Sequence, residues 1–470
     1  MKNKKLLLFI SFVIFSYVVK AQSDIMYFMN ETPQSSFINP AFGSKLGSTY
    51  ISLPALSGLN FNFNTSGYCY HDLINQHPIY KDSLQIDLNG FYNKLKSSLD
   101  INILGDISLF GLGITFGKTH LSLDLKFGFS SRIELDKSIF GFILDGFGNE
   151  DKGLVLDAPL LNIQTYISPS VSLAREFGDK LKIGTRVGML FGIMDITSKE
   201  TIIAVTENNG TLAVETNFDV LTANIFGRFR SNSLFNDTTN STEFNMANMN
   251  DILSTAFNNK GFVIDVGGAY KITDNMEVSL GVSDFGFIKW TTNTTAIRSK
   301  HPNNRVEFDG IRSSLDSLSS QVEEYLEHIG DTLLYITDMK ADSIAPYTSM
   351  LPTKLYAGLT WKFFGASYLH ALYKGVIGNG YFDNYFSIFY GLHWGAIALS
   401  FGNTFSTHVA FNPSFSVSLT GIGFNIYAGG SFSFTKSGFN VADMSAANIF
   451  AGVNLLIGRK PYWKSSVIPL

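Results

Sequence analysis

The 470-residue chain has little charge, one cysteine and, beyond its first twenty residues, no long apolar run. Charged residues make up 16% of it, whereas about 25% is usual in soluble domains. The single cysteine, Cys69, excludes an internal disulfide framework. Without a long apolar run, no membrane-spanning helix is expected in the mature chain. A net charge of −4 and the absence of a basic stripe exclude nucleic acid as a partner.

What the chain has instead is aromatic residues and glycine, with 42 Phe, 20 Tyr and 42 Gly. Glycine suits tight turns and bends in strands. Low charge combined with many aromatic residues is typical of a lipid-facing band that is edged by aromatic girdles.

Alternating hydrophobicity is the dominant pattern. Residues 121–130 read LSLDLKFGFS, which places Leu123 and Leu125 on one side of a strand and Asp124 and Lys126 on the other. Similar segments recur along most of the chain. We therefore predict an all-β protein, a closed antiparallel transmembrane β-barrel of about 14 strands, with apolar residues outside and polar residues inside.

The N-terminus has the layout of a secretory signal peptide over residues 1–21. Lys2, Lys4 and Lys5 precede an apolar run at 6–19, and small or medium residues precede Gln22. The alternative is an anchor helix, but the run is short for a membrane span, which favours cleavage. Export and a barrel together predict the outer membrane of a gram-negative cell, with its lipid as a partner.

Several further segments are predicted. Residues 22–46 are polar and contain several prolines, so they are expected to form a plug before the barrel at 47–458. Helical spacing predicts short helices at 87–99 and 313–329, the latter within a long polar insertion at 291–347. Residues 459–470 form a C-terminal tail. Single long strands are expected at 385–402 and 404–420, and the irregular pattern after Asp284 predicts a β-bulge.

Several short motifs, taken in order, resemble an uncharacterised family of outer-membrane barrels in the FadL-like and PorV-like group. The motifs are Asn39-Pro40-Ala41, Leu181-Lys182-Ile183-Gly184, Lys260-Gly261-Phe262, Ser283-Asp284-Phe285-Gly286-Phe287-Ile288-Lys289-Trp290 and Leu351-Pro352-Thr353-Lys354-Leu355-Tyr356. The resemblance implies a barrel with the N-terminal segment inside or beneath it. The tail that follows the last strand departs from barrels that end on an aromatic residue.

Three groups of residues are candidates for function. Asn39, Pro40 and Ala41 are expected to form a hatch, although Asn-Pro is also ordinary turn chemistry. Asp284, Phe285 and Gly286 are the candidate strand kink and lateral exit. The inward charges are expected to line a polar pore, or alternatively to fill the barrel with salt-linked side chains; they are Asp124, Lys126, Lys182, Arg186, Lys354 and Lys362.

No catalytic or cofactor site is expected. There is no GxSxG elbow and no recognisable Ser-His-Asp set, so an enzyme is not predicted. His71, His77 and Asp72 match no standard metal spacing, and neither a metal nor a cofactor is assigned.

Two functions remain open. The FadL resemblance implies a channel for hydrophobic or amphipathic small molecules. The alternative is a structural or adaptor barrel in an outer-membrane secretion or assembly complex, with protein partners docking on the insertion at 291–347. A continuous apolar cavity from hatch to wall favours the first, and a filled lumen favours the second.

Overall fold

The computed structural model describes most of the chain. The described residues are 25–45, 49–76, 80, 83–145, 154–157, 160–208, 211–231, 243–300, 305–308, 338–406, 412–435 and 440–458.

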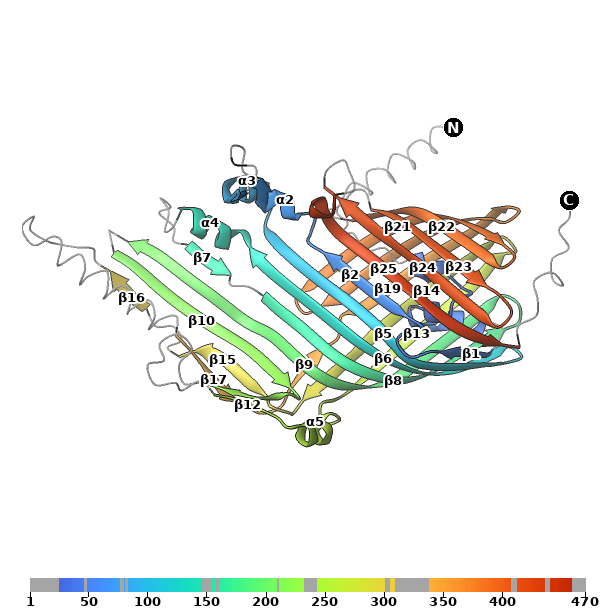
Figure 1. Ribbon diagram of the computed structural model, residues 1–470, viewed down its shortest axis with the longest axis horizontal. Helices are drawn as coiled ribbons and strands as arrows, with labels where there is room; N and C mark the ends of the chain where they lie inside the picture. Colours follow the sequence, from blue (N-terminus) through green and yellow to red (C-terminus); the bar gives the residue numbers. More distant parts are fainter. Residues whose placement is uncertain are drawn as a thin grey trace, which may run out of the picture.

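Fourteen strands close into a single antiparallel ring, which confirms the predicted barrel and its strand number (Figure 1). The last strand pairs with its predecessor and also with β1 and β2, which together serve as the first strand. In order round the ring, the strands are β1 (Thr49–Ser52) with β2 (Leu59–Asn64), β5 (Ser98–Phe116), β6 (Thr119–Asp136), β8 (Leu160–Phe177), β9 (Leu181–Asn208), β13 (Lys260–Thr273), β14 (Met276–Trp290), β19 (Thr353–Phe364), β20 (Ser367–Gly378), β21 (Tyr381–Trp394), β22 (Ile397–Ser406), β23 (Pro413–Thr420), β24 (Phe424–Phe434) and β25 (Met444–Ile457).

The two ends of the barrel differ in their connections. At one end the strands are joined by tight turns with glycine in the left-handed region, as at Gly117, Gly178 and Gly365, where φ is 60°, 61° and 50°. Most connections at the other end are long. Outer-membrane barrels place short turns in the periplasm and long loops outside the cell, which orients this barrel.

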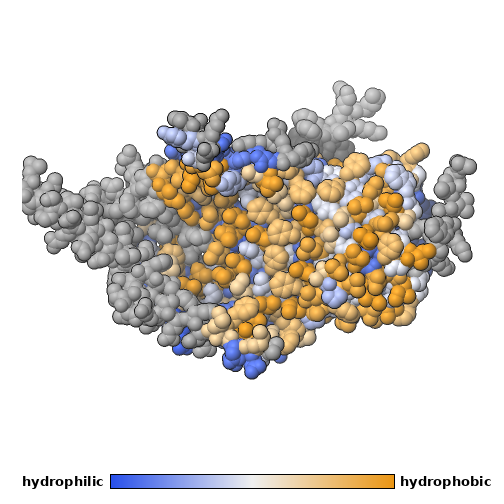
Figure 2. Space-filling model, viewed as in Figure 1, coloured by the Kyte–Doolittle hydropathy of each residue, from blue (hydrophilic) through white to orange (hydrophobic). Residues whose placement is uncertain are grey.

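The outer surface of the barrel carries an apolar band, visible as the orange surface in Figure 2. Leu123, Val187 and Trp361 are 49%, 44% and 45% exposed, whereas Asp124 on the opposite face is only 2% exposed. This inside-out distribution confirms the predicted register. Exposed apolar side chains of this kind suit contact with lipid, and every barrel strand pairs with a neighbour on each side, as a membrane requires.

β9 extends beyond the barrel and carries additional strands on the long-loop side (Figure 1). Its second half pairs with β10 and with β7 instead of β13, and β10 in turn pairs with β15 and β16. We call this part the sheet extension. Its strands besides β9 are β7 (Leu154–Asp157), β10 (Thr211–Asn224), β15 (Thr295–Ser299), β16 (Arg305–Phe308) and β17 (Met339–Ser343).

The remaining elements lie in the long connections. Tyr68, Phe91, Leu95 and Phe140 form a small apolar cluster among the helices there. None of the described helices is long and apolar enough to cross a membrane. The elements are α2 (Tyr70–Leu73), β3 (Ile74–Gln76), β4 (Leu84–Ile86), α3 (Leu88–Lys94), α4 (Lys137–Asp145), β11 (Gly227–Arg230), β12 (Glu243–Met246), α5 (Met249–Thr255), β18 (Tyr347–Met350) and η5 (Val441–Asp443).

Three local predictions were wrong. The helix predicted at 87–99 ends at Lys94, because Leu95 is extended (ψ 125°) and the chain then enters β5. Residues 385–402 are two strands that meet at the turn of Gly395, where φ is 56°. Residues 404–420 are likewise divided between β22 and β23. At Gly395 the alternation only changes phase, whereas the outward apolar residues of β22 and β23 stand at odd positions in both strands.

Other predictions fall outside the described residues. They are the signal peptide at 1–21, the helix at 313–329 and the tail at 459–470.

The register of β6 yields a direct test. Leu123→Arg places a charge against lipid within the apolar band, where it should cost up to about 2–4 kcal/mol. Ser130→Arg, the matched control, places the same charge on the lumen side and should cost far less. Urea midpoints of folding into lipid vesicles measure both. Equal shifts for the two variants would contradict the assigned register.

Candidate functional site in the barrel lumen

Residues 25–45 lie inside the ring of strands, and we call them the lumen segment. They form three short 3-10 helices, η1 (Ile25–Phe28), η2 (Pro33–Phe37) and η3 (Pro40–Lys45). Tyr27 and Phe42 are 0% and 2% exposed, although no long secondary structure holds them. The segment is therefore positioned by its contacts with the barrel wall.

The first contact is with a row of glycines. Gly184, Gly267 and Gly281 are direct neighbours on β9, β13 and β14. A Cβ on Gly267 would lie 1.9 Å from Asn39 Oδ1, and one on Gly184 would lie 2.4 Å from the nitrogen of Ala41. The absence of side chains in this glycine row lets the backbone of the predicted hatch lie directly on the wall.

Hydrogen bonds fix Asn39 against this wall. Its Nδ2 donates to the carbonyl oxygen of Leu280 and to the Tyr27 hydroxyl, each at 3.1 Å, and its Oδ1 accepts from the Ala41 N–H. Tyr27 donates to Ser279 Oγ at 2.9 Å. Burial raises the pKa of Tyr27 to about 12, so its hydroxyl remains a donor at neutral pH.

A second contact joins the lumen segment to the seam where the barrel closes. Gln34 Nε2 donates to Asn454 Oδ1 at 3.0 Å, and Asn454 Nδ2 donates back to Gln34 Oε1 at 2.9 Å. The pair is buried, so both amides satisfy each other in a site that excludes water. The lumen segment is thus bonded to opposite regions of the ring.

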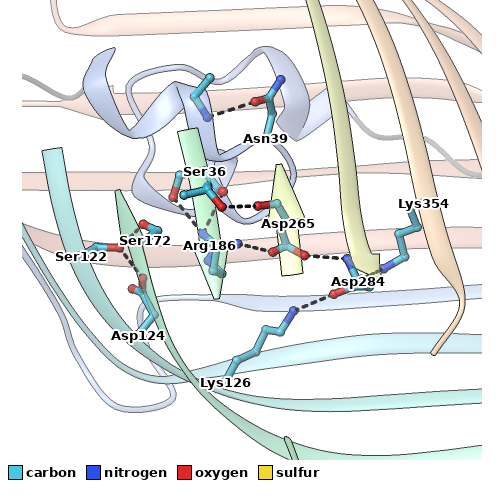
Figure 3. A network of polar contacts seen from close by, with 12 residues as sticks. Ser36, Asn39, Ser122, Asp124, Lys126, Ser172, Arg186, Asp265, Asp284 and Lys354 are labelled. Atoms are coloured by element: carbon cyan, nitrogen blue, oxygen red, sulfur yellow. Dashed lines mark hydrogen bonds and ion pairs between the residues drawn. The ribbon is translucent and has the colours of Figure 1, made fainter. Parts of the chain in front are cut away.

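A chain of charged groups forms the third contact (Figure 3). Arg186 Nη2 donates to the carbonyl oxygen of Ser36 at 2.8 Å, and its Nη1 lies 3.1 Å from Asp265 Oδ2. Asp265 Oδ1 accepts from the backbone N–H of Asp284 at 2.7 Å. Lys354 Nζ then donates to Asp284 Oδ2 at 2.7 Å. These contacts, which we call the ionic chain, connect the lumen segment to four wall strands.

The predicted bulge is present at the end of this chain. Register between β13 and β14 shifts between Ile264 and Val266, and Asp284 has φ 58°, a left-handed conformation that is uncommon for a residue other than glycine. The shift turns Asp284 inward and Phe285 outward, where Phe285 is 56% exposed. The bulge therefore aims a carboxylate at the lysines of neighbouring strands. Whether this position serves as a lateral exit stays a prediction.

The structure brings together only some of the predicted lumen charges. Lys126 lies 3.8 Å from Asp284 and belongs to the ionic chain with Arg186 and Lys354. Asp124 lies beside it but is bonded to Ser122 and to the Tyr50 hydroxyl. The other two lie apart from this centre: Lys182 pairs with Glu176 at 3.3 Å, and Lys362 is exposed near a short turn.

A chamber of about 80 Å³ lies between the lumen segment and the wall. The segment contributes Met26, Phe37 and Ile38, whereas Lys126 and Lys354 contribute charge from the wall. Asn62 and Ser108 also line it, and both residues are buried. The chamber therefore has a mixed apolar and polar lining.

An apolar groove lies on the lipid side of the wall that the lumen segment covers from within. Its lining comes from β13, β14, β19 and β20 and includes Gly268, Leu280, Ala357 and Tyr373. Gly267 and Gly281 of the glycine row also border it. At this point only backbone separates the lumen segment from the outer surface. We call this part of the barrel the thin wall.

Sequence reasoning missed the glycine row, Asp265 and Tyr27. Gly184 and Asp284 stood in the motifs of the resemblance, but nothing in the sequence paired them with partners. A usable signal was present: Gly184, Gly267 and Gly281 each occupy the polar, inward phase of an alternating strand. Small residues at inward positions of successive strands indicate a place where another segment approaches closely.

No group of three potential metal ligands occurs among the described residues. His71 is paired with Asp443 at 2.8 Å and Asp72 with Lys94 at 2.6 Å, so both histidine and carboxylate have structural partners. His77 lies outside the described residues.

The ionic chain can be tested by removing its central cation. Arg186→Met leaves the buried Asp265 without its guanidinium and should lower the free energy of unfolding by about 3–5 kcal/mol. The double variant Arg186→Met with Asp265→Asn removes the orphaned charge and should recover more than half of that loss. Urea unfolding in detergent measures both. A double variant as unstable as the single one would show that the pair is not coupled.

The chain was also compared with known proteins. The sequence profile described as "Family of unknown function (DUF5723)" matches residues 40–430. No curated protein matches the chain in sequence.

Several solved barrels resemble it in outline. The toluene transporter TodX of Pseudomonas putida is 10% identical with a TM-score of 0.39, covering 90% of this chain and 93% of its own. A FadL homologue of Pseudomonas aeruginosa is 12% identical with a TM-score of 0.38, covering 90% and 92%. The translocator domain of the autotransporter NalP from Neisseria meningitidis is 9% identical with a TM-score of 0.32, covering 90% and 99%. None of these likenesses assigns a cargo to this chain.

Proposed function

We propose that this chain, which belongs to the DUF5723 family of unknown function, is a gated outer-membrane channel for hydrophobic or amphipathic small molecules. The lumen segment is its hatch. The thin wall is the place where cargo leaves the lumen for the membrane.

One observation carries the proposal: Asn39 of the hatch lies on the glycine row, directly behind the outer apolar groove. A molecule in the chamber is separated from lipid by the hatch and one layer of backbone. Displacement of Asn39 would uncover the inner face of Gly267 and Gly281. The wall there has no side chains of its own on that face, so movement of the hatch changes access more than it would elsewhere.

The neighbouring bulge supports an exit at this place. Pairing between β13 and β14 is interrupted beside Asp265, so the two strands are held by fewer ladder hydrogen bonds there. The same strands carry the ionic chain, which is anchored to the hatch through Ser36. Withdrawal of the hatch would remove one hydrogen-bond acceptor from Arg186 and leave its Nη2 without the Ser36 carbonyl. Movement of the hatch would then be coupled to a change in the wall at the bulge.

The chamber lining favours amphipathic cargo over purely apolar cargo. Met26, Phe37 and Ile38 supply an apolar surface, and Lys354 and Asn62 supply polar groups facing the same space. An apolar molecule would leave these polar groups without water or a partner, which is costly. A molecule with one polar end satisfies both sides.

A structural or adaptor role is the second candidate, favoured by the sheet extension. β9 runs for 28 residues, whereas about 9–11 suffice to cross a membrane. The part of β9 beyond the barrel and β10 together present a broad β-surface outside the barrel. A barrel that remains closed after loss of its hatch would support this role over the channel.

The hatch is tested by a pair of adjacent glycines. Gly267→Ala places a methyl group 1.9 Å from Asn39 Oδ1 and should push the hatch off the wall. Gly268→Ala, its control, faces the groove, where the nearest atom is 3.7 Å away. We expect a several-fold rise in single-channel conductance for Gly267→Ala and none for Gly268→Ala. Deletion of 22–46 gives the fully open reference. The conductance of the double variant Asn39→Ala with Pro40→Ala should lie between that of the full chain and that of the deletion.

A deletion variant that assembles and stays as tight as the full chain would contradict the hatch. Heat-modifiable migration on gels reports assembly in each case, because closure depends on strand pairing and not on the lumen segment.

The lateral exit is tested from the outside. Gly268→Leu fills the apolar groove without facing the lumen, so it should slow delivery of the apolar dye N-phenyl-1-naphthylamine into vesicle membranes. The same change in the 22–46 deletion should leave the conductance to small ions unaltered, because ions cross along the barrel axis. Unchanged dye delivery by Gly268→Leu would rule out exit at the thin wall.

A further inference from the structure

Two lysines face outward side by side at the long-loop edge of the apolar band. Lys260 of β13 is the direct cross-strand partner of Lys289 of β14, and both are exposed. Cβ atoms of such pairs lie about 4.5–5.5 Å apart, and like charges at this distance repel. No described carboxylate forms an ion pair with either lysine. Their position therefore costs stability unless an anion binds between them.

The residues around the lysine pair place it at the surface of the membrane. One step towards the membrane interior, the outward side chains of four adjacent strands are Met189, Phe262, Phe287 and Met350, each in register with the next. All four are exposed large apolar side chains. A charged row directly above an apolar row marks the boundary between lipid headgroups and hydrocarbon.

Aromatic side chains continue this boundary on one side. Phe191 of β9 is the other register neighbour of Lys260, and it packs edge-to-face on Phe257 with ring centroids 5.0 Å apart. Phe257 is 58% exposed and lies in the turn that follows α5. An acyl chain lying beside the apolar row would therefore meet aromatic rings, while its headgroup would meet the two ammonium groups.

We propose that Lys260 and Lys289 form a binding site for the phosphate of an outer-leaflet membrane lipid. The two ammonium groups supply donors to one phosphate, whose charge removes their mutual repulsion. The apolar row beneath binds the acyl chains of the same molecule. The combination selects a phosphorylated lipid over free phosphate, because free phosphate cannot use the apolar row. This site is separate from the lumen and is independent of the proposed channel.

The site is tested by native mass spectrometry of the full chain in detergent, with bis-phosphorylated lipid A as the probe. Lys260→Gln with Lys289→Gln should bind it at least about tenfold more weakly, since hydrogen bonds to charged groups are lost on both residues. Lys271→Gln, at the opposite end of β13, is the control and should bind as the parent does. Lys260→Arg with Lys289→Arg keeps both charges and should retain binding.

Two comparisons separate the sources of phosphate. Dephosphorylated lipid A should bind the parent as weakly as the double Gln variant binds the phosphorylated form. Inorganic phosphate alone should bind far more weakly than the lipid. Equal binding of lipid A by the parent and the double Gln variant, equal binding of the dephosphorylated lipid, or equally tight binding of inorganic phosphate would each overturn the proposal. If the double Gln variant does not assemble, Lys260→Gln and Lys289→Gln are measured singly, and unchanged binding by both has the same consequence.

Discussion

The contact of Arg186 with the Ser36 carbonyl and with Asp265 is the interaction on which the interior depends. A guanidinium buried in a barrel must have its charge balanced and its donors bonded. Asp265 balances the charge, and the backbone of the lumen segment accepts from one of the donors. The same carboxylate holds the backbone of the bulge at Asp284. One side chain therefore joins a segment without regular structure to the most irregular point of the wall.

Steric constraint complements this electrostatic one. The glycine row removes side chains where the lumen segment lies, and the bulge adds a carboxylate one step further along the same strands. Together they give the wall two adjacent surfaces, one for close backbone contact and one for charge. The chamber lies beside the charged surface. Residues of β14 and β19 therefore line the chamber as well as the wall on which the hatch lies.

The barrel was predictable because alternation is a local property. Within one strand, apolar Leu123 and charged Asp124 already indicate which side faces lipid and which faces the lumen. Strand number and the bulge followed from the same pattern. The turn at Gly395 was missed because alternation persists across it and only the phase changes. The ionic chain could not be predicted from the sequence for another reason. Arg186, Asp265 and Asp284 are far apart in sequence, and nothing local specifies which inward charges meet once the sheet has closed.

The order of pairing has a consequence for how the protein is assembled. The ring closes only when β25 meets β1 and β2, as at Ala451 and Leu59, so nearly the whole chain must be present first. Such distant pairing is slow to form. The lumen segment precedes β1 and is bonded to Asn454 of the closing strand. Strand closure therefore encloses the lumen segment, and late threading of that segment into a finished barrel is unnecessary.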